Sequence, residues 1–195
     1  MLNMAPDTAG ERAATHGWQS ALLLPVPAAE PAVGPHRARL DAAARDGVPA
    51  HLTVLYPFLP PGLIDGAVLT SLRRLFAGFP AFGFTLDRVA WFDEDVVWLG
   101  PRDVAPFCDL MARTGEAFPQ CPPSGGRYAA VIPHLTIGDR GGPAALRAAE
   151  TAVRPFLPVE AEATEVVLMA GPVPGNPDTP PGQWRRLASF PLRPC

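Results

Sequence analysis

The chain has 195 residues, of which 48% are hydrophobic and 18% charged, so it can form a packed core and is not a disordered chain. Its net charge of −3 argues against a broad basic surface for wrapping duplex DNA. Its three cysteines form no C-x-x-C pair and no apolar run approaches the roughly 18 residues of a membrane helix, so we expect a soluble cytoplasmic protein without membrane attachment.

The first half of the chain predicts short elements separated by prolines and glycines. Residues 1–17 show no periodicity and predict a mobile N-terminal tail. After this tail, apolar runs and helical spacing predict a strand at 19–26, a helix at about 35–46, a strand at 51–58, a helix at 64–79, and strands at 82–86 and 96–99. Pro35 is expected near the start of the first helix and Gly47 just after its end.

The second half predicts a similar order. Its expected elements are a helix at about 104–118 capped by Asp103, a strand near 131–138, a helix at 143–154, and strands at 165–170 and 184–190. No polar linker is long enough to separate independent domains. We therefore predict an α+β fold in which residues 18–192 form one bilobal domain, with halves at approximately 18–94 and 95–192.

A repeated motif lies at matching places in the two halves. The first copy reads His51-Leu-Thr-Val and the second reads His134-Leu-Thr-Ile. Side chains alternate between the two faces of a strand, so His51 and Thr53 should share one face, as should His134 and Thr136. If an approximate two-fold relates the halves, two imidazoles and two hydroxyls meet in one cleft.

Such a group of side chains suits phosphoryl chemistry. Because the ordinary pKa of histidine is near 6.5, one imidazole can be neutral and the other protonated at physiological pH. The neutral ring can take a proton from water or a hydroxyl while the cation protonates the leaving oxygen. Threonine hydroxyls can donate hydrogen bonds to the phosphate oxygens.

The motif has two other interpretations, a structural role and a metal site. A single His-x-Thr strand is often structural, but its duplication favours a site. A metal site would need further ligands, for which only Asp139 and the acidic turn 93–95 are available. No H-x-H or H-E-x-x-H spacing supports such a site, and we predict neither a metal nor a cofactor.

The paired motifs, the first of which continues into Tyr56-Pro57-Phe58, resemble the HxTx motifs of the 2H phosphoesterase superfamily, which includes the 2′-5′ RNA ligase-like proteins. The resemblance covers about residues 18–192. It implies a bilobal α+β fold with two pseudo-two-fold-related lobes, whose mostly antiparallel sheets line a central cleft with helices outside.

The same resemblance implies an RNA-processing hydrolase that opens 2′,3′-cyclic phosphates without a metal, with 2′-5′ RNA ligation as the reverse activity. On this chain it makes His51 and His134 the catalytic acid and base, in an order that the sequence leaves open. It makes Thr53 and Thr136 the phosphate-binding residues.

Further substrate contacts are expected around this site. Aromatic side chains can stack on a base, and an arginine after a glycine-rich loop can contact a phosphate. The candidates are Tyr56, Phe58, Arg127 and Tyr128. Weaker candidates are Arg88, Arg140, Arg185 and Arg186.

The mild acidity favours a small nucleotide or an RNA terminus with a cyclic phosphate over a transfer RNA, and we expect a monomer with no duplex DNA partner. Two alternatives stay open. The first is a non-catalytic module that binds a nucleotide or phosphate. The second is a cyclic phosphodiesterase that acts on an ADP-ribose derivative.

Overall fold

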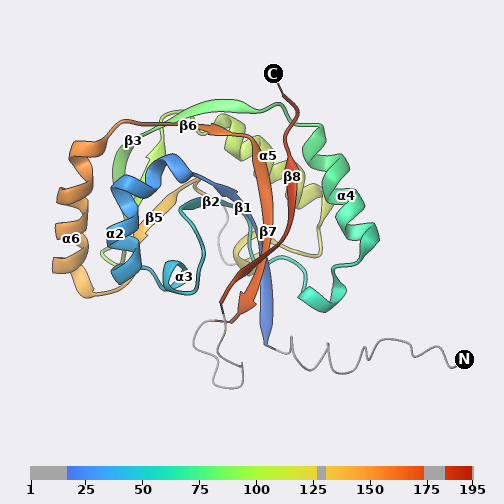
Figure 1. Ribbon diagram of the computed structural model, residues 1–195, viewed down its shortest axis with the longest axis horizontal. Coiled ribbons are helices and arrows are strands. Elements are labelled where there is room, and N and C mark those ends of the chain that lie inside the picture. Colours follow the sequence, from blue (N-terminus) through green and yellow to red (C-terminus); the bar gives the residue numbers. More distant parts are fainter. Residues whose placement is uncertain (1–16, 127–130, 174–182, 195) are drawn as a thin grey trace, which may run out of the picture.

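A computed structural model describes residues 17–126, 131–173 and 183–194 (Figure 1). The strands are β1 (Trp18–Pro25), β2 (His51–Leu55), β3 (Phe82–Phe92), β4 (Val96–Pro101), β5 (Leu135–Gly138), β6 (Val159–Ala163), β7 (Glu165–Pro172) and β8 (Arg185–Pro191). The helices are α2 (Glu30–Leu40), α3 (Ala42–Arg45), α4 (Gly66–Ala77), α5 (Ala105–Ala117) and α6 (Gly142–Val153). The expected tail, apart from Gly17, lies outside the described residues.

The strands form two antiparallel sheets of four strands each. Their orders are β2–β1–β7–β8 and β5–β4–β3–β6. Both sheets combine strands from the two halves of the sequence, since β7 pairs with β1 and β3 pairs with β4 and β6. The expected α+β class with antiparallel sheets is confirmed.

The two faces of the β2–β1–β7–β8 sheet have different environments. Alternate residues such as Leu22, Leu52 and Leu168 belong to the main core. The intervening residues Leu23 and Met169 belong to a smaller apolar cluster on the opposite face. This face carries the site described below.

The helices cover the sheets from several sides. Helix α4 packs against β8 and α5 against β2, while α2 and α6 contact each other and both contact β5. In Figure 1, α2 and α6 lie together on one side of the sheets and α4 lies on the other. None of the helices in the described ranges is long and apolar enough to span a bilayer.

The helix expected at 35–46 is divided in the structure. Helix α2 begins at Glu30, contains Pro35 within it and ends at Leu40, and α3 follows from Ala42. The division occurs because Asp41 has an extended backbone and its carboxylate caps α3 by accepting a hydrogen bond from the Ala43 N–H at 2.8 Å.

The strand expected near 131–138 is shorter than predicted. Strand β5 begins at Leu135, so His134 immediately precedes it. Pro133 has no N–H to donate to a neighbouring strand, which explains the late start. Strand β2 likewise ends at Leu55, just before Tyr56 and Pro57.

Candidate active site

The first motif lines a cavity of about 290 Å³ on the exposed face of the β1–β2 pair. His51 and Thr53 face this cavity, whereas Leu52 and Val54 are buried in the main core, as the alternation predicted. Cross-strand pairing fixes their register, because His51 lies opposite Pro25 and Thr53 opposite Leu23.

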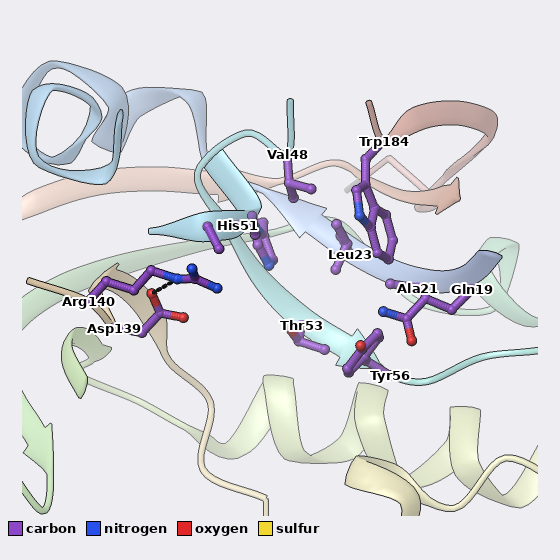
Figure 2. Close-up of a pocket in the computed structure, with 12 residues that line it drawn as sticks. Gln19, Ala21, Leu23, Val48, His51, Thr53, Tyr56, Asp139, Arg140 and Trp184 are labelled. Carbon is purple, nitrogen blue, oxygen red and sulfur yellow. Dashed lines mark ion pairs between the residues drawn. The ribbon is translucent and has the colours of Figure 1, made fainter. Parts of the chain in front are cut away.

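The two ends of the cavity differ in chemistry. The lining residues are Gln19, Ala21, Leu23, Ala42, Ala43, Val48, His51, Thr53, Tyr56, Asp139, Arg140 and Trp184. Figure 2 shows Arg140 and Asp139 on one side of His51, with Tyr56, Gln19 and Trp184 on the other. The site therefore places a charged end and an aromatic end around a central imidazole and hydroxyl.

Trp184 reaches the cavity because a glycine lies beneath it. A Cβ atom built on Gly171 of β7 would come within 2.3 Å of the indole ring. The indole also contacts the Tyr56 ring, with ring centroids 6.5 Å apart. Only glycine at position 171 lets the tryptophan lie this close to the sheet.

The two motif histidines are held in the same way. Nδ1 of His51 lies 2.7 Å from the carbonyl oxygen of Pro49, and Nδ1 of His134 lies 2.7 Å from that of Ile132. A carbonyl oxygen only accepts hydrogen bonds, so Nδ1 carries the hydrogen in both rings. In the neutral form the lone pair is therefore on Nε2, which is left to accept or donate a proton.

The second motif has a different setting from the first. Leu135 and Ile137 are fully buried in the core, while His134 and Thr136 are only partly buried. The imidazole of His134 contacts two rings, those of Phe92 and Trp98, at centroid distances of 4.9 and 5.8 Å.

The fold brings the two motifs together. Strands β2 and β5 contact each other, and the charge on His134 influences the pKa of His51. The cavity itself is lined by His51 and Thr53 but not by His134 and Thr136. On the β5 side the cavity is lined by Asp139 and Arg140, which directly follow that strand.

The environment of both histidines favours the neutral form. The pKa of His51 is lowered to about 4, first because burial disfavours the imidazolium and then because the Arg37 cation lies nearby. Burial also lowers the pKa of His134, and its hydrogen bond to the Ile132 carbonyl opposes that effect. Burial and the charge of Asp41 raise the pKa of Asp139.

The other expected contacts are only partly found at the site. Tyr56 lines the cavity and is 37% exposed. Phe58 does not line it: the ring is buried in the core, edge-on to Phe118 at a centroid distance of 5.0 Å. Arg127 and Tyr128 lie outside the described residues.

Gln19 and Trp184 line the cavity but were not predicted from the sequence, and Arg140 was predicted only as a weaker candidate. The sequence also did not predict a group of charged residues behind His51, of which Arg37 and Asp41 are almost fully buried. Their i, i+4 spacing on a helix was the available signal, but this spacing is more often found on solvated surfaces. In the described part of the chain, no three His, Cys, Asp or Glu side chains are grouped so that they could hold a metal ion.

Solved structures show the same fold. E. coli LigT complexed with 3′-AMP has a TM-score of 0.58 and 20% identity, covering 89% of this chain and 97% of LigT. LigT complexed with NADP+ has a TM-score of 0.53 and 22% identity, with coverages of 91% and 98%. A structure described as a phosphoesterase has a TM-score of 0.57 and 19% identity, with coverages of 91% and 99%.

Sequence comparison gives the family. No curated protein sequence matches the chain at a significant level. The model of the 2′-5′ RNA ligase superfamily, however, matches residues 24–171, which include both His-x-Thr motifs. With the LigT-like fold and the paired motifs on contacting strands, this match shows that the chain belongs to the 2′-5′ RNA ligase superfamily of 2H phosphoesterases.

Proposed function

We propose that this protein opens 2′,3′-cyclic phosphates on nucleotides or RNA ends by metal-independent acid–base catalysis with His51 and His134. Thr53 and Thr136 bind the phosphate oxygens. The observation that carries the proposal is the matched arrangement of the two imidazoles. Each is held through Nδ1 by the carbonyl two residues earlier, which leaves both Nε2 atoms for proton transfer.

The reaction is a displacement at phosphorus by water. The neutral imidazole takes a proton from the attacking water, a new P–O bond forms, and one bond to the 2′ or 3′ oxygen breaks. The protonated imidazole gives its proton to that leaving oxygen, so a phosphomonoester and a free hydroxyl result. Reversal with an RNA 5′-hydroxyl as nucleophile joins two ends, which is the 2′-5′ ligation considered for this family.

The cavity supports a nucleotide-sized substrate. Its volume of about 290 Å³ lies just below the lower limit of the roughly 300–1,000 Å³ typical of small-molecule sites. A phosphate beside His51 and Thr53 leaves Trp184 and Tyr56 to contact a base and Arg140 to contact a further phosphate. The LigT complexes with 3′-AMP and NADP+ show that a similar fold accommodates nucleotides.

The test is a substrate panel followed by phosphorus NMR. The panel contains the four 2′,3′-cyclic mononucleotides, short RNAs ending in a cyclic phosphate, and an ADP-ribose cyclic phosphate. We expect phosphomonoester signals from at least the mononucleotides or RNAs, with one oxygen-18 per phosphate when the reaction runs in labelled water. Turnover of the ADP-ribose compound alone would support that alternative.

Two further measurements separate the remaining alternatives. Turnover should be unchanged by EDTA, and complete loss that zinc or manganese restores would contradict the metal-independent mechanism. Calorimetry on the same panel tests the binding-module alternative. Tight nucleotide binding without any product would overturn the enzymatic proposal.

A further inference from the structure

A buried ion pair lies directly behind the first motif. Arg37 is 2% exposed and Asp41 3% exposed. Nε and Nη2 of Arg37 donate to Oδ2 of Asp41 at 2.9 and 2.7 Å, and Nη2 also lies 3.3 Å from the Val48 carbonyl oxygen. Buried ion pairs are weak contributors to stability because desolvation offsets their attraction, so stability alone does not account for this one.

The contacts of the pair lead to the segment that orients His51. This segment, Val48–Ala50, is held at each end: Val48 by Arg37, and Ala50 by Glu30, whose Oε1 accepts from the Ala50 N–H at 2.6 Å. The Ala50 carbonyl accepts from the Val26 N–H at 2.8 Å. Between these anchored residues lies Pro49, whose carbonyl accepts the Nδ1 hydrogen of His51.

The same end of α2 is joined to the second motif strand. The Leu40 carbonyl accepts a hydrogen bond from the Asp139 N–H at 2.8 Å, directly after β5. Leu40 also packs against Gly138, the last residue of that strand. Helix α2 thus contacts both β5 and the segment that directly precedes β2.

We propose that Arg37 is a positioning residue for His51: by holding the Val48 carbonyl together with Asp41, it fixes the segment whose Pro49 carbonyl orients the imidazole. Glu30 completes this support from the first turn of α2. The inference rests on the proposed function, in which His51 transfers a proton. It adds to that mechanism Arg37 and Glu30, which act through His51 and do not contact the substrate.

The charged groups around His51 give this proposal a measurable signature. On the α2 side these groups are Arg37, Asp41 and Glu30, and on the β5 side they are His134, Asp139 and Arg140. Arg37 lowers the pKa of His51 and Asp41 raises it, with Arg37 the larger of the two influences. Removal of the Arg37 cation should therefore raise the pKa of His51.

The main test compares Arg37→Met and Arg37→Lys with Arg39→Met, which removes an exposed arginine from the same helix. We expect Arg37→Met to lower kcat by as much as about 10²-fold with little change in KM, because a misplaced proton-transfer group loses its alignment. In a proton NMR titration, the pKa of His51 should be higher in Arg37→Met than in the wild type. Arg37→Lys should keep the His51 titration closer to that of the wild type but not restore kcat, since one ammonium cannot replace the guanidinium fork.

A second pair of variants covers the case in which Arg37→Met does not fold. Glu30 is only partly buried, so Glu30→Ala should fold and lower kcat through loss of the acceptor for Ala50. Glu30→Gln keeps an oxygen acceptor and should restore most of the lost rate. Equal kcat in the wild type, Glu30→Ala and a folded Arg37→Met would overturn the proposal.

The NMR titration separates this inference from the proposed function. If no cyclic phosphate is turned over by the wild type, the proposed function fails, but the titration of His51 still reports whether Arg37 controls its surroundings. An unchanged His51 titration in folded Arg37→Met would overturn the positioning role even in an active enzyme.

Discussion

The ring of Phe92 lies perpendicular to the imidazole of His134, with ring centroids 4.9 Å apart. This contact, together with Trp98, shields the second histidine from water, and burial is the largest cause of its lowered pKa. Burial is also the largest cause of the lowered pKa of His51, but there the second cause is the Arg37 cation. Both histidines are therefore oriented by a hydrogen bond from Nδ1 to a carbonyl oxygen, but different neighbouring residues influence their pKa values.

Replacing Phe92 with alanine should raise the pKa of His134 toward its ordinary value of 6.5. The reason is that water regains access to the ring and stabilises the imidazolium. Proton NMR titration of the histidine ring signals measures this change, and Phe156→Ala, which removes an exposed ring, is the control. An unchanged or lower pKa in Phe92→Ala would contradict the assignment of burial as the main cause.

His51→Ala and His134→Ala should each lower kcat by roughly 10²–10⁴-fold, the range for loss of a general acid or base. Steady-state kinetics on a cyclic mononucleotide that the wild type hydrolyses measures the loss. His36→Ala is the matched control, because His36 lies on α2 and does not line the cavity. Near-wild-type turnover by either motif variant would remove that histidine from the mechanism.

The pH dependence of kcat/KM should be bell-shaped with its optimum below pH 6.5. A rate that needs one neutral and one protonated imidazole is highest midway between the two pKa values. Both pKa values are lowered in the free protein, that of His51 to about 4. Activity therefore falls toward neutral pH, where the catalytic acid loses its proton. It also falls in strong acid, where the catalytic base gains one.

A bound phosphate favours both imidazolium forms, so the profile of kcat should lie at higher pH than that of kcat/KM. Rate measurements from about pH 3 to pH 9, in buffers of constant ionic strength, test both statements. A profile that rises monotonically would exclude a mechanism with two titrating histidines.

Thr53→Val and Thr136→Val should each reduce kcat/KM by about 10- to 100-fold. Valine keeps the shape of threonine but cannot donate a hydrogen bond, and a bond to a charged phosphate is worth roughly 1.5–3 kcal/mol. Thr151→Val on α6 is the control, because that hydroxyl donates to the Arg147 carbonyl on an exposed surface. Unchanged kinetics would mean that the motif hydroxyls do not contact the phosphate.

Gly138→Ala should lower the free energy of unfolding by about 1–3 kcal/mol, the usual cost of overpacking. A Cβ at this position would lie 2.8 Å from the Cβ of Leu40 and 2.9 Å from Cδ2 of Leu146. Urea denaturation measures the change. Gly83→Ala on β3 is the control, since no atom lies within 4 Å of its Cβ position, and equal stability of the two variants would refute the close contact.

The sequence was sufficient to predict the motif strands because alternation has a direct physical cause. Leu52 and Leu135 are buried, and the histidines and threonines point away from the core, as a period of two requires. Strand β6 was missed, although Val159, Ala161 and Ala163 alternate with glutamates. Its small apolar residues give a weak signal, and pairing with β3 is what makes it a strand.

The surroundings of the site were harder to predict because they depend on contacts between distant segments. Trp184 reaches the cavity only because β8 pairs with β7 next to Gly171. Arg37 is one of several arginines in the sequence, and its partners, the Asp41 carboxylate and the Val48 carbonyl, are known only from the fold. Phe58 was expected at the site from its place after the motif, but the chain turns it into the core.

The pairing of β1 with β7 also has a consequence during synthesis. A chain emerging from the ribosome presents β1 and β2 long before residues 165–172 exist, so one edge of β1 stays open until the C-terminal region is made. A product that stops between β5 and β7 keeps both motif histidines but lacks the strand that pairs with β1. We therefore expect that a polypeptide must be translated beyond β7 before the sheet around His51 is complete, and that shorter products expose the edge of β1 to pairing with other chains.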